Sequence, residues 1–298
     1  MLKLKVTILL LVIPLMIFSQ LKTPFVMYDH QSDSQYKKEL KLLKKDPDHE
    51  SLTIIKSIAE LSYDFMDWDT AIDYYERLIV DSPQAENYFK LSVAAARKSL
   101  EVPRLFSVSY VVKARKYAFE AHQLRPKQPN FLSLLIQLYA EIPPLLGGDI
   151  AYAEKKANEL RDIDPVAGGM MQAYIFDIKN NLKAAKSKII EVFRYLKEEF
   201  SDPNQWDKEL GRNLIFELGR AAAEYQIEPD LGMLLLEHYQ RDFGLKDNYP
   251  LEWAYFYQSK IYLYMRKTKD AEVSLIKSLE INPYFNEGLG FLNTIELE

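Results

Sequence analysis

Prolines recur along this chain at a nearly constant interval, and that interval constrains the fold more than any other feature. The successive spacings are 43, 39, 38 and 80 residues, the last being two intervals, for Pro83, Pro126, Pro165, Pro203 and Pro283. Each proline closes a segment with the apolar pattern of two amphipathic helices. A helix pair in every period of about forty residues predicts a repeat array, in which neighbouring units bury each other's apolar faces.

Short side chains stand where the two helices of a unit are expected to cross. Ala59 and Ala71 are twelve residues apart in the first unit, and Ser259 and Ala271 are twelve apart in the last. Helices pack at about 8–10 Å only where the side chains at the crossing are short. This recurrence predicts close antiparallel helix pairs along most of the chain.

The segment from Leu52 to Pro83 resembles the tetratricopeptide repeat (TPR), a helix-turn-helix unit with small residues at the helix crossing. Trp68 stands in the expected turn, and Tyr75 follows four residues after Ala71. The resemblance extends over roughly residues 52–285. It implies an all-α fold, a right-handed α-solenoid or TPR-like superhelix of about six antiparallel helix pairs. The first helix of each pair would face the concave side.

The beginning of the chain has the pattern of a secretory signal peptide. Lys3 and Lys5 precede an apolar run from Val6 to Phe18, and Ser19 supplies a small residue before a cleavage point. Thirteen apolar residues form a helix of about 20 Å, too short for a bilayer core of about 30 Å. We therefore expect an exported protein, periplasmic or extracellular. An uncleaved N-terminal anchor remains the alternative.

These features divide the chain into four segments. We expect a signal peptide over 1–19, a lead-in with a short helix over 20–50, the array over 51–285 and a C-terminal capping segment over 286–298. Asp33 or Ser34 is expected to cap the lead-in helix. Because the chain contains no cysteine, it is not a cysteine-linked lipoprotein and has neither disulfides nor thiolate metal sites.

One turn resembles that of particular groups of TPR proteins. Pro143 ends a helix, Gly147 and Gly148 permit positive backbone dihedrals, and Asp149 is placed to cap the next helix. This Pro-Pro-Leu-Leu-Gly-Gly-Asp sequence is similar to a turn of exported bacterial TPR proteins. It is also similar to one in the periplasmic TPR component of some tripartite solute transporters.

The sequence carries no recognisable catalytic or cofactor motif. The four histidines lie in no metal-ligand spacing, and no phosphate loop or nucleophile elbow is present. Asp67, Asp69 and Asp73 are explained by helix capping through Asp69. We expect no enzymatic activity, no cofactor and no metal. The net charge of −5 argues against nucleic-acid binding, which depends largely on lysine and arginine.

The resemblance implies which side chains line the concave groove. Aromatic rings provide contact area at low entropic cost, and Arg97, Arg220 and Lys260 could anchor a carboxylate. For any one of these residues, packing within the fold is the competing interpretation. The candidate partner-binding residues are Tyr63, Phe89, Arg97, Tyr139, Tyr174, Phe216, Arg220, Phe256, Lys260 and Tyr264.

Two functions follow from this interpretation. The favoured one is a non-enzymatic exported scaffold that binds a protein or peptide partner of the cell envelope in its concave groove, without stable membrane insertion after signal cleavage. The alternative is a periplasmic solute-binding or accessory component of a membrane transporter. An open trough would favour a peptide, and a closed pore with converging cations would favour a solute.

Overall fold

The structure, a computed structural model, describes residues 29–295 except 201, 203–205 and 245. The predicted signal peptide over 1–19 lies outside the described residues, as do residues 296–298 of the predicted capping segment. All regular elements of the described chain are helices, so the predicted all-α solenoid is confirmed. Among the described helices, none combines the length and apolar character needed to cross a membrane.

The helices follow one another as antiparallel pairs, each packed against the next. A single helix, α1 (Ser34–Lys44), precedes the pairs, and α15 (Asn286–Ile295) follows them. A short 3-10 helix, η1 (Pro144–Leu146), lies within the third pair, and α10 (Trp206–Glu209) precedes the fifth. The pairs are α2 (Leu52–Asp64) with α3 (Trp68–Asp81), α4 (Ala85–Glu101) with α5 (Arg104–Leu124), α6 (Pro129–Glu141) with α7 (Ile150–Ile163), α8 (Pro165–Ile178) with α9 (Leu182–Glu199), α11 (Arg212–Tyr225) with α12 (Pro229–Arg241), and α13 (Leu251–Tyr264) with α14 (Thr268–Ile281).

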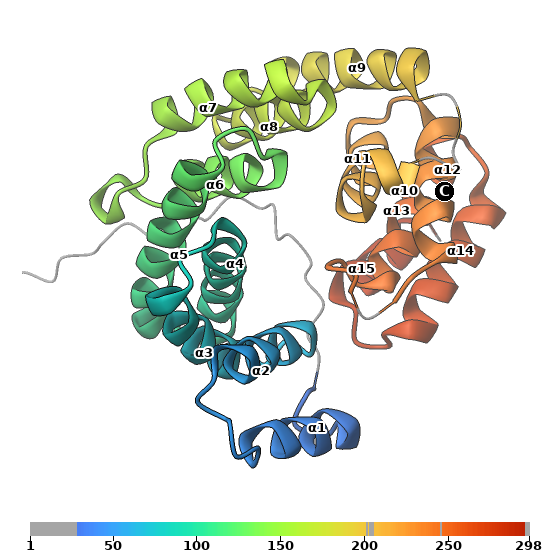
Figure 1. Cartoon of the computed structure of the whole chain (residues 1–298). Helices are drawn as coiled ribbons and strands as arrows, with labels where there is room; N and C mark the ends of the chain where they lie inside the picture. Colours follow the sequence, from blue (N-terminus) through green and yellow to red (C-terminus); the bar gives the residue numbers. More distant parts are fainter. Residues whose placement is uncertain (1–28, 201, 203–205, 245, 296–298) are drawn as a thin grey trace, which may run out of the picture.

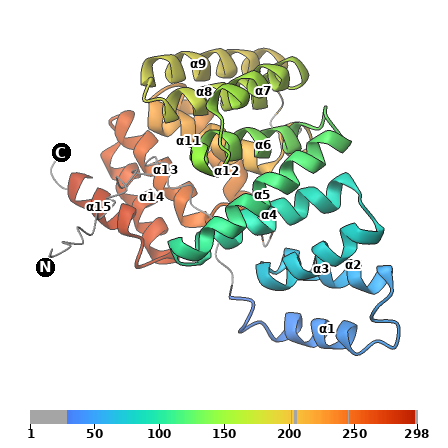
Figure 2. The ribbon, with the colours of Figure 1, turned by 90° about the vertical axis from the view of Figure 1, so that its left-hand side faces the viewer.

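The pairs form an arch. In Figure 1, α1 to α6 make up one arm, α7 to α9 run across the top, and α10 to α15 make up the other arm. Figure 2 shows that the ends of the two arms are displaced from each other along the axis of the arch, as in a shallow superhelical turn. The helices α4, α8 and α11 lie on the inner side, while α5 and α12 lie on the outer side (Figure 1).

Each pair is held by close contact at short side chains. Ala59, Ala71, Ser259 and Ala271 all have an exposed fraction of 0%. The Ser259 hydroxyl donates to the Ala271 carbonyl at 2.8 Å, and the Ser92 hydroxyl donates in the same way to the Ala114 carbonyl at 2.7 Å. Side chains of one helix therefore reach the backbone of its partner, which requires the close approach that the sequence predicts.

The turn between α6 and α7 needs glycine at two positions, for two different reasons. Gly147 has a φ of 92°, which glycine adopts without strain. Gly148 is required for another reason, because a Cβ there would lie 1.6 Å from the Ile142 carbonyl oxygen. Asp149 caps α7 by accepting from the backbone N–H of Tyr152 at 3.0 Å, which confirms the predicted cap.

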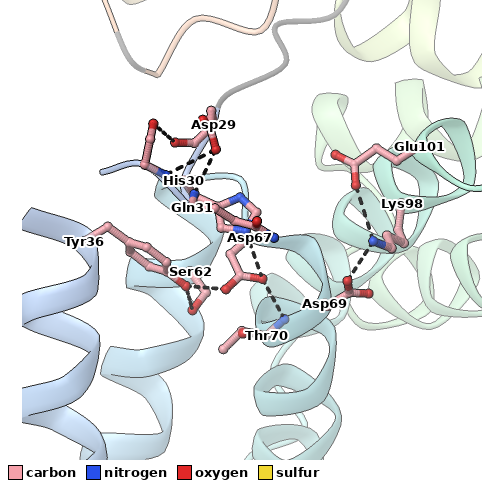
Figure 3. Close-up of polar contacts among 11 residues, drawn as sticks. Asp29, His30, Gln31, Tyr36, Ser62, Asp67, Asp69, Thr70, Lys98 and Glu101 are labelled. Atoms are coloured by element: carbon pink, nitrogen blue, oxygen red, sulfur yellow. Dashed lines mark hydrogen bonds and ion pairs between the residues drawn. The ribbon is translucent and has the colours of Figure 1, made fainter. Parts of the chain in front are cut away.

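The start of α3 corrects one predicted cap. Asp67, and not Asp69, accepts from the backbone N–H of Thr70 at 3.1 Å. Asp69 is directed outward and pairs with Lys98 at 2.7 Å (Figure 3). The physical reason is that α3 begins at Trp68, so that Asp69 already lies inside the first turn.

Asp67 also fastens the first helix to the array. The Tyr36 hydroxyl of α1 donates to Asp67 at 2.5 Å and lies 3.1 Å from the Ser62 hydroxyl (Figure 3). His30 Nε2 lies 3.9 Å from the Asp67 carboxylate. Asp33 caps α1 by accepting from the backbone N–H of Tyr36 at 2.8 Å, as expected. The helix α1 thereby covers the otherwise open end of the first repeat.

The helix crossings can be tested by overpacking. Replacing Ala71 or Ala271 by phenylalanine should lower the free energy of unfolding by about 1–3 kcal/mol, because each methyl group is fully enclosed. Chemical denaturation measures the change. The control is Val80→Phe on α3, where the side chain is 76% exposed and little change is expected. Equal stability of all variants would contradict the proposed crossing.

The Asp67 carboxylate predicts a pH dependence. Partial burial raises its pKa, but hydrogen bonds from Tyr36 and Thr70 outweigh this and hold the pKa below 3.8. The stabilisation is therefore complete above the pKa of the unfolded chain and is lost as pH falls through the lower, folded-state pKa. The difference in unfolding free energy between the native chain and Asp67→Asn should be constant above about pH 5 and should shrink as the pH falls further. A difference independent of pH would contradict this role.

Candidate functional site

Charged and aromatic side chains from the two arms meet on the inner side of the arch. Tyr63 of α2 and Arg97 of α4 come from the first arm. Glu217 and Arg220 of α11 come from the second, together with Tyr249, which precedes α13. Tyr63 and Tyr249 both interact electrostatically with Arg97. We call these five residues the central cluster.

The segment Asp242–Pro250 joins α12 to α13 and is referred to as the connection. Arg212 of α11 donates to both carboxylate oxygens of Asp247, at 2.6 and 3.0 Å. The Tyr239 hydroxyl donates to the Tyr249 carbonyl at 2.7 Å and accepts from the Tyr249 N–H at 3.2 Å. The Tyr249 ring stacks on Phe216 at 4.3 Å. The second arm thus holds the connection firmly in place.

The connection also touches the first arm. Arg97 donates to the side-chain oxygen of Asn248 at 3.0 Å, although the two residues are 151 positions apart. Lys246 lies 3.8 Å from Asp64 at the end of α2. These two contacts join the arms across the inner side of the arch. Burial lowers the pKa of the Arg97 guanidinium to about 10, so its immediate surroundings are poorly hydrated.

The second arm holds its own cations with carboxylates. Arg220 donates to Glu217 through two nitrogens, at 2.8 and 2.5 Å. Burial alone would lower the pKa of Arg220, but the Glu217 carboxylate outweighs it and raises the pKa above its ordinary value. Lys260 pairs with Glu224 at 2.9 Å and lies 5.6 Å from the centre of the Phe256 ring.

The structure therefore changes the expected role of the three predicted anchor cations. Arg97 contacts Asn248, Arg220 contacts Glu217, and Lys260 contacts Glu224. Each cation therefore already has a hydrogen-bond acceptor within the chain. A partner carboxylate would have to displace that acceptor or share the cation with it.

Two of the predicted contact residues belong to the core. Phe216 is 0% exposed and lies among Tyr239, Tyr249 and Tyr257. Phe256 is 7% exposed and packs against Trp253, Phe285 and Phe291. The prediction of a surface contact is wrong for both, because the connection covers Phe216 and the C-terminal helix α15 packs over Phe256.

The remaining predicted contact residues lie in separate places and do not form one site. Phe89 stacks on Phe131 of α6 at 4.7 Å, and the Tyr174 hydroxyl donates to Glu141. Tyr139 lies between Arg115 of α5 and Tyr152 of α7, so its contacts are with the second helices of two pairs and not with the central cluster. Tyr264, at the end of α13, is 46% exposed.

Two surface depressions lie away from the central cluster. One of about 250 Å³ lies beside α5 and is lined by Arg115, Lys116, Phe119, Glu120 and Tyr139. Another of about 290 Å³ lies between α12, α13 and α14, with Tyr255, Tyr262 and Lys277 in its lining. The described residues include no group of three histidine or acidic side chains positioned to hold a metal ion.

Sequence reasoning missed the connection, which supplies Asp247, Asn248 and Tyr249 to the site. Its sequence, Gly-Leu-Lys-Asp-Asn-Tyr-Pro, has the composition of an ordinary turn between helices. The only available signal was the unusual spacing between α12 and α13. Its contacts with Arg97 and Asp64 depend on the curvature of the whole array, which no local pattern encodes.

Comparison with known proteins adds little beyond the fold. No protein-family model matches the chain, and no curated protein matches it. The solved structures that resemble it include a thermophilic TPR protein from Thermus thermophilus, with 17% identity, 72% of this chain and 100% of that chain covered, and a TM-score of 0.43. A TPR protein from Parabacteroides merdae has 11% identity, coverage of 88% and 90%, and a TM-score of 0.49.

A third similar structure is YrrB, a TPR protein with an unusual peptide-binding site. It shares 13% identity, covers 74% of this chain and 97% of its own, and has a TM-score of 0.38. Likenesses this distant do not assign a partner. The description of this chain as a TPR-like all-α solenoid rests on its own helix pairs and on the short side chains at their crossings.

The ion pair that holds the connection predicts a large stability effect. Arg212→Ala would leave the Asp247 carboxylate, which is 4% exposed, without its bidentate partner. Removal of one member of a buried pair costs about 3–5 kcal/mol. Chemical denaturation should show a loss of this size, and Arg212→Lys should show a smaller one. A loss below about 1 kcal/mol for Arg212→Ala would contradict the anchoring role.

Proposed function

We propose that this protein is a non-enzymatic scaffold that binds a protein or peptide partner on the inner face of its arch. The observation that carries this proposal is the central cluster, where rings and charges from opposite arms come together on the inner side of the arch. The cores that stabilise the fold lie within and between the helix pairs. Tyr249 belongs to the core of the second arm, but Tyr63 and Arg97 are partly exposed and are available for recognition.

The chemistry of the inner face suits an extended partner. Half-buried tyrosines such as Tyr63 and Tyr174 offer rigid surface that loses little entropy on binding. Charged groups alternate with them, as in the Lys260–Glu224 pair. A curved row of such groups presents several contacts along its length, each suited to a different side chain of the partner.

The export of the protein is part of the same proposal. Its support is the sequence of the first nineteen residues, with two lysines before an apolar run and a small residue at its end. We propose that the partner is a component of the cell envelope. The similarity of the turn sequence at 143–149 to a turn of exported TPR proteins is a second reason for this proposal.

A protein partner accounts for the geometry better than a small solute does. Solute sites are enclosed pockets in which a few polar groups converge on the ligand. The two depressions described above lie beside α5 and between α12 and α14, away from the cations of the central cluster. Those cations also have acceptors within the chain already.

Partner capture from envelope extract tests the proposal. The native chain should retain a specific protein, and the double variant Tyr174→Ala with Lys260→Ala should retain it at least about tenfold more weakly, because two inner-face contacts are removed. Quantitative pull-down at several bait concentrations measures the change. The mass of the endogenous chain in the same extract shows whether the first nineteen residues have been removed.

The matched control is an exposed tyrosine that is not among the candidate contact residues. Tyr284 precedes α15 and is 87% exposed, so Tyr284→Ala should leave capture unchanged. Equal capture by the double variant and the native chain would contradict binding at the inner face. Retention of a small molecule but of no protein would favour the solute-binding accessory function instead.

A further inference from the structure

The connection presents its side chains alternately to the two arms. Lys246 and Asn248 point toward the first arm, where they contact Asp64 and Arg97. Asp247, between them, points the other way and is held by Arg212. Two residues of the connection that are two positions apart thus contact the same arm. The first arm is therefore contacted by a basic group and, two positions later, by an amide.

The contacts that Lys246 and Asn248 make with the first arm are of a weak kind. The side chains of Lys246 and Asp64 are 86% and 45% exposed, and an exposed ion pair contributes little to stability. Asn248 offers Arg97 a neutral amide oxygen at 3.0 Å. A carboxylate in the same position would form a charge-assisted bond, which is about twice as strong. Another segment could therefore displace the connection from the first arm.

We propose that the connection is an internal ligand of the inner face. When it is displaced, Asp64 and Arg97 bind a segment of a partner protein instead. That segment has a basic residue, which pairs with Asp64, and two positions later an amide or a carboxylate, which pairs with Arg97. This inference rests on the proposed function and specifies the partner that it requires. It also predicts regulation, because the partner must compete with Lys246 and Asn248. The arms are then free to separate.

The surroundings of Arg97 support the preference for a carboxylate at the second position. Tyr63 and Tyr249 interact with this guanidinium, and burial lowers its pKa. Electrostatic attraction is stronger in a poorly hydrated position than at an open surface. Asp64 carries the opposite charge on the last turn of α2, so the pair also fixes the direction of the bound segment.

A synthetic peptide tests the inference without knowledge of the natural partner. The probe is a fluorescein-labelled, capped Ser-Lys-Ser-Asp-Ser peptide, and fluorescence anisotropy at low salt measures its binding to the full chain. The variant Lys246→Ala with Asn248→Ala lacks the internal contacts but keeps Asp247 and Tyr249, which anchor the connection. This variant should bind the probe about tenfold more tightly than the native chain does.

Two further variants establish the site of binding. Adding Arg97→Ala to the double variant should weaken binding at least tenfold. The control, Lys277→Ala, removes a cation of α14 that lies over the Tyr255 ring, and it should leave probe binding unchanged. A peptide with alanine in place of aspartate should bind several-fold more weakly, and one with lysine and aspartate exchanged should also lose affinity.

The outcome separates this inference from the proposed function. The inference is overturned if the Lys246→Ala, Asn248→Ala variant binds the probe no better than the native chain, or if Arg97→Ala has no effect in that background. Partner capture that still depends on Tyr174 and Lys260 would then leave the proposed function standing. If probe binding follows the prediction while envelope capture fails, the recognition site is supported and the cellular partner assignment is wrong.

Discussion

Close crossing of paired helices at short side chains is the constraint on which the rest of the structure depends. At Ala59, Ala71, Ser259 and Ala271 no surface remains exposed. The Ser259 hydroxyl reaches across its pair to the Ala271 carbonyl. A larger side chain at such a crossing would push the helices apart and alter the angle at which the next pair stacks. Because each pair sets the position of its neighbour, small local distances determine the curvature of the whole arch.

That curvature brings together residues that are remote in sequence. Arg97 meets Asn248 across an interval of 151 positions, although the intervening pairs contact mainly their neighbours. The stable part of this junction belongs to the second arm, where Arg212 and Asp247 hold the connection. Its ion pair with the first arm, between Lys246 and Asp64, is largely exposed. A firmly anchored segment that touches the opposite arm lightly is suited to competition with a partner.

Local sequence patterns predicted the helices well but predicted the inner face poorly. The helix pairs, the small residues at the crossings and the Asp149 cap all follow from short-range rules of helix packing and termination. Phe216 shows the limit of this approach. Its position in α11 suggested an exposed ring, but the connection packs over it and leaves it 0% exposed. Burial by a remote segment depends on tertiary geometry, and periodicity within one helix does not report it.

The distance between the two arms in solution tests the central claim most directly. Because the chain has no cysteine, the double variant Lys56→Cys on α2 and Asp242→Cys beside α12 carries spin labels at these two positions only. Pulsed electron paramagnetic resonance measures the distance between the two labels. The account predicts one narrow distance distribution at low salt, which shifts to longer distances when Lys246 and Asn248 are replaced by alanine. A broad distribution that these replacements leave unchanged would contradict it.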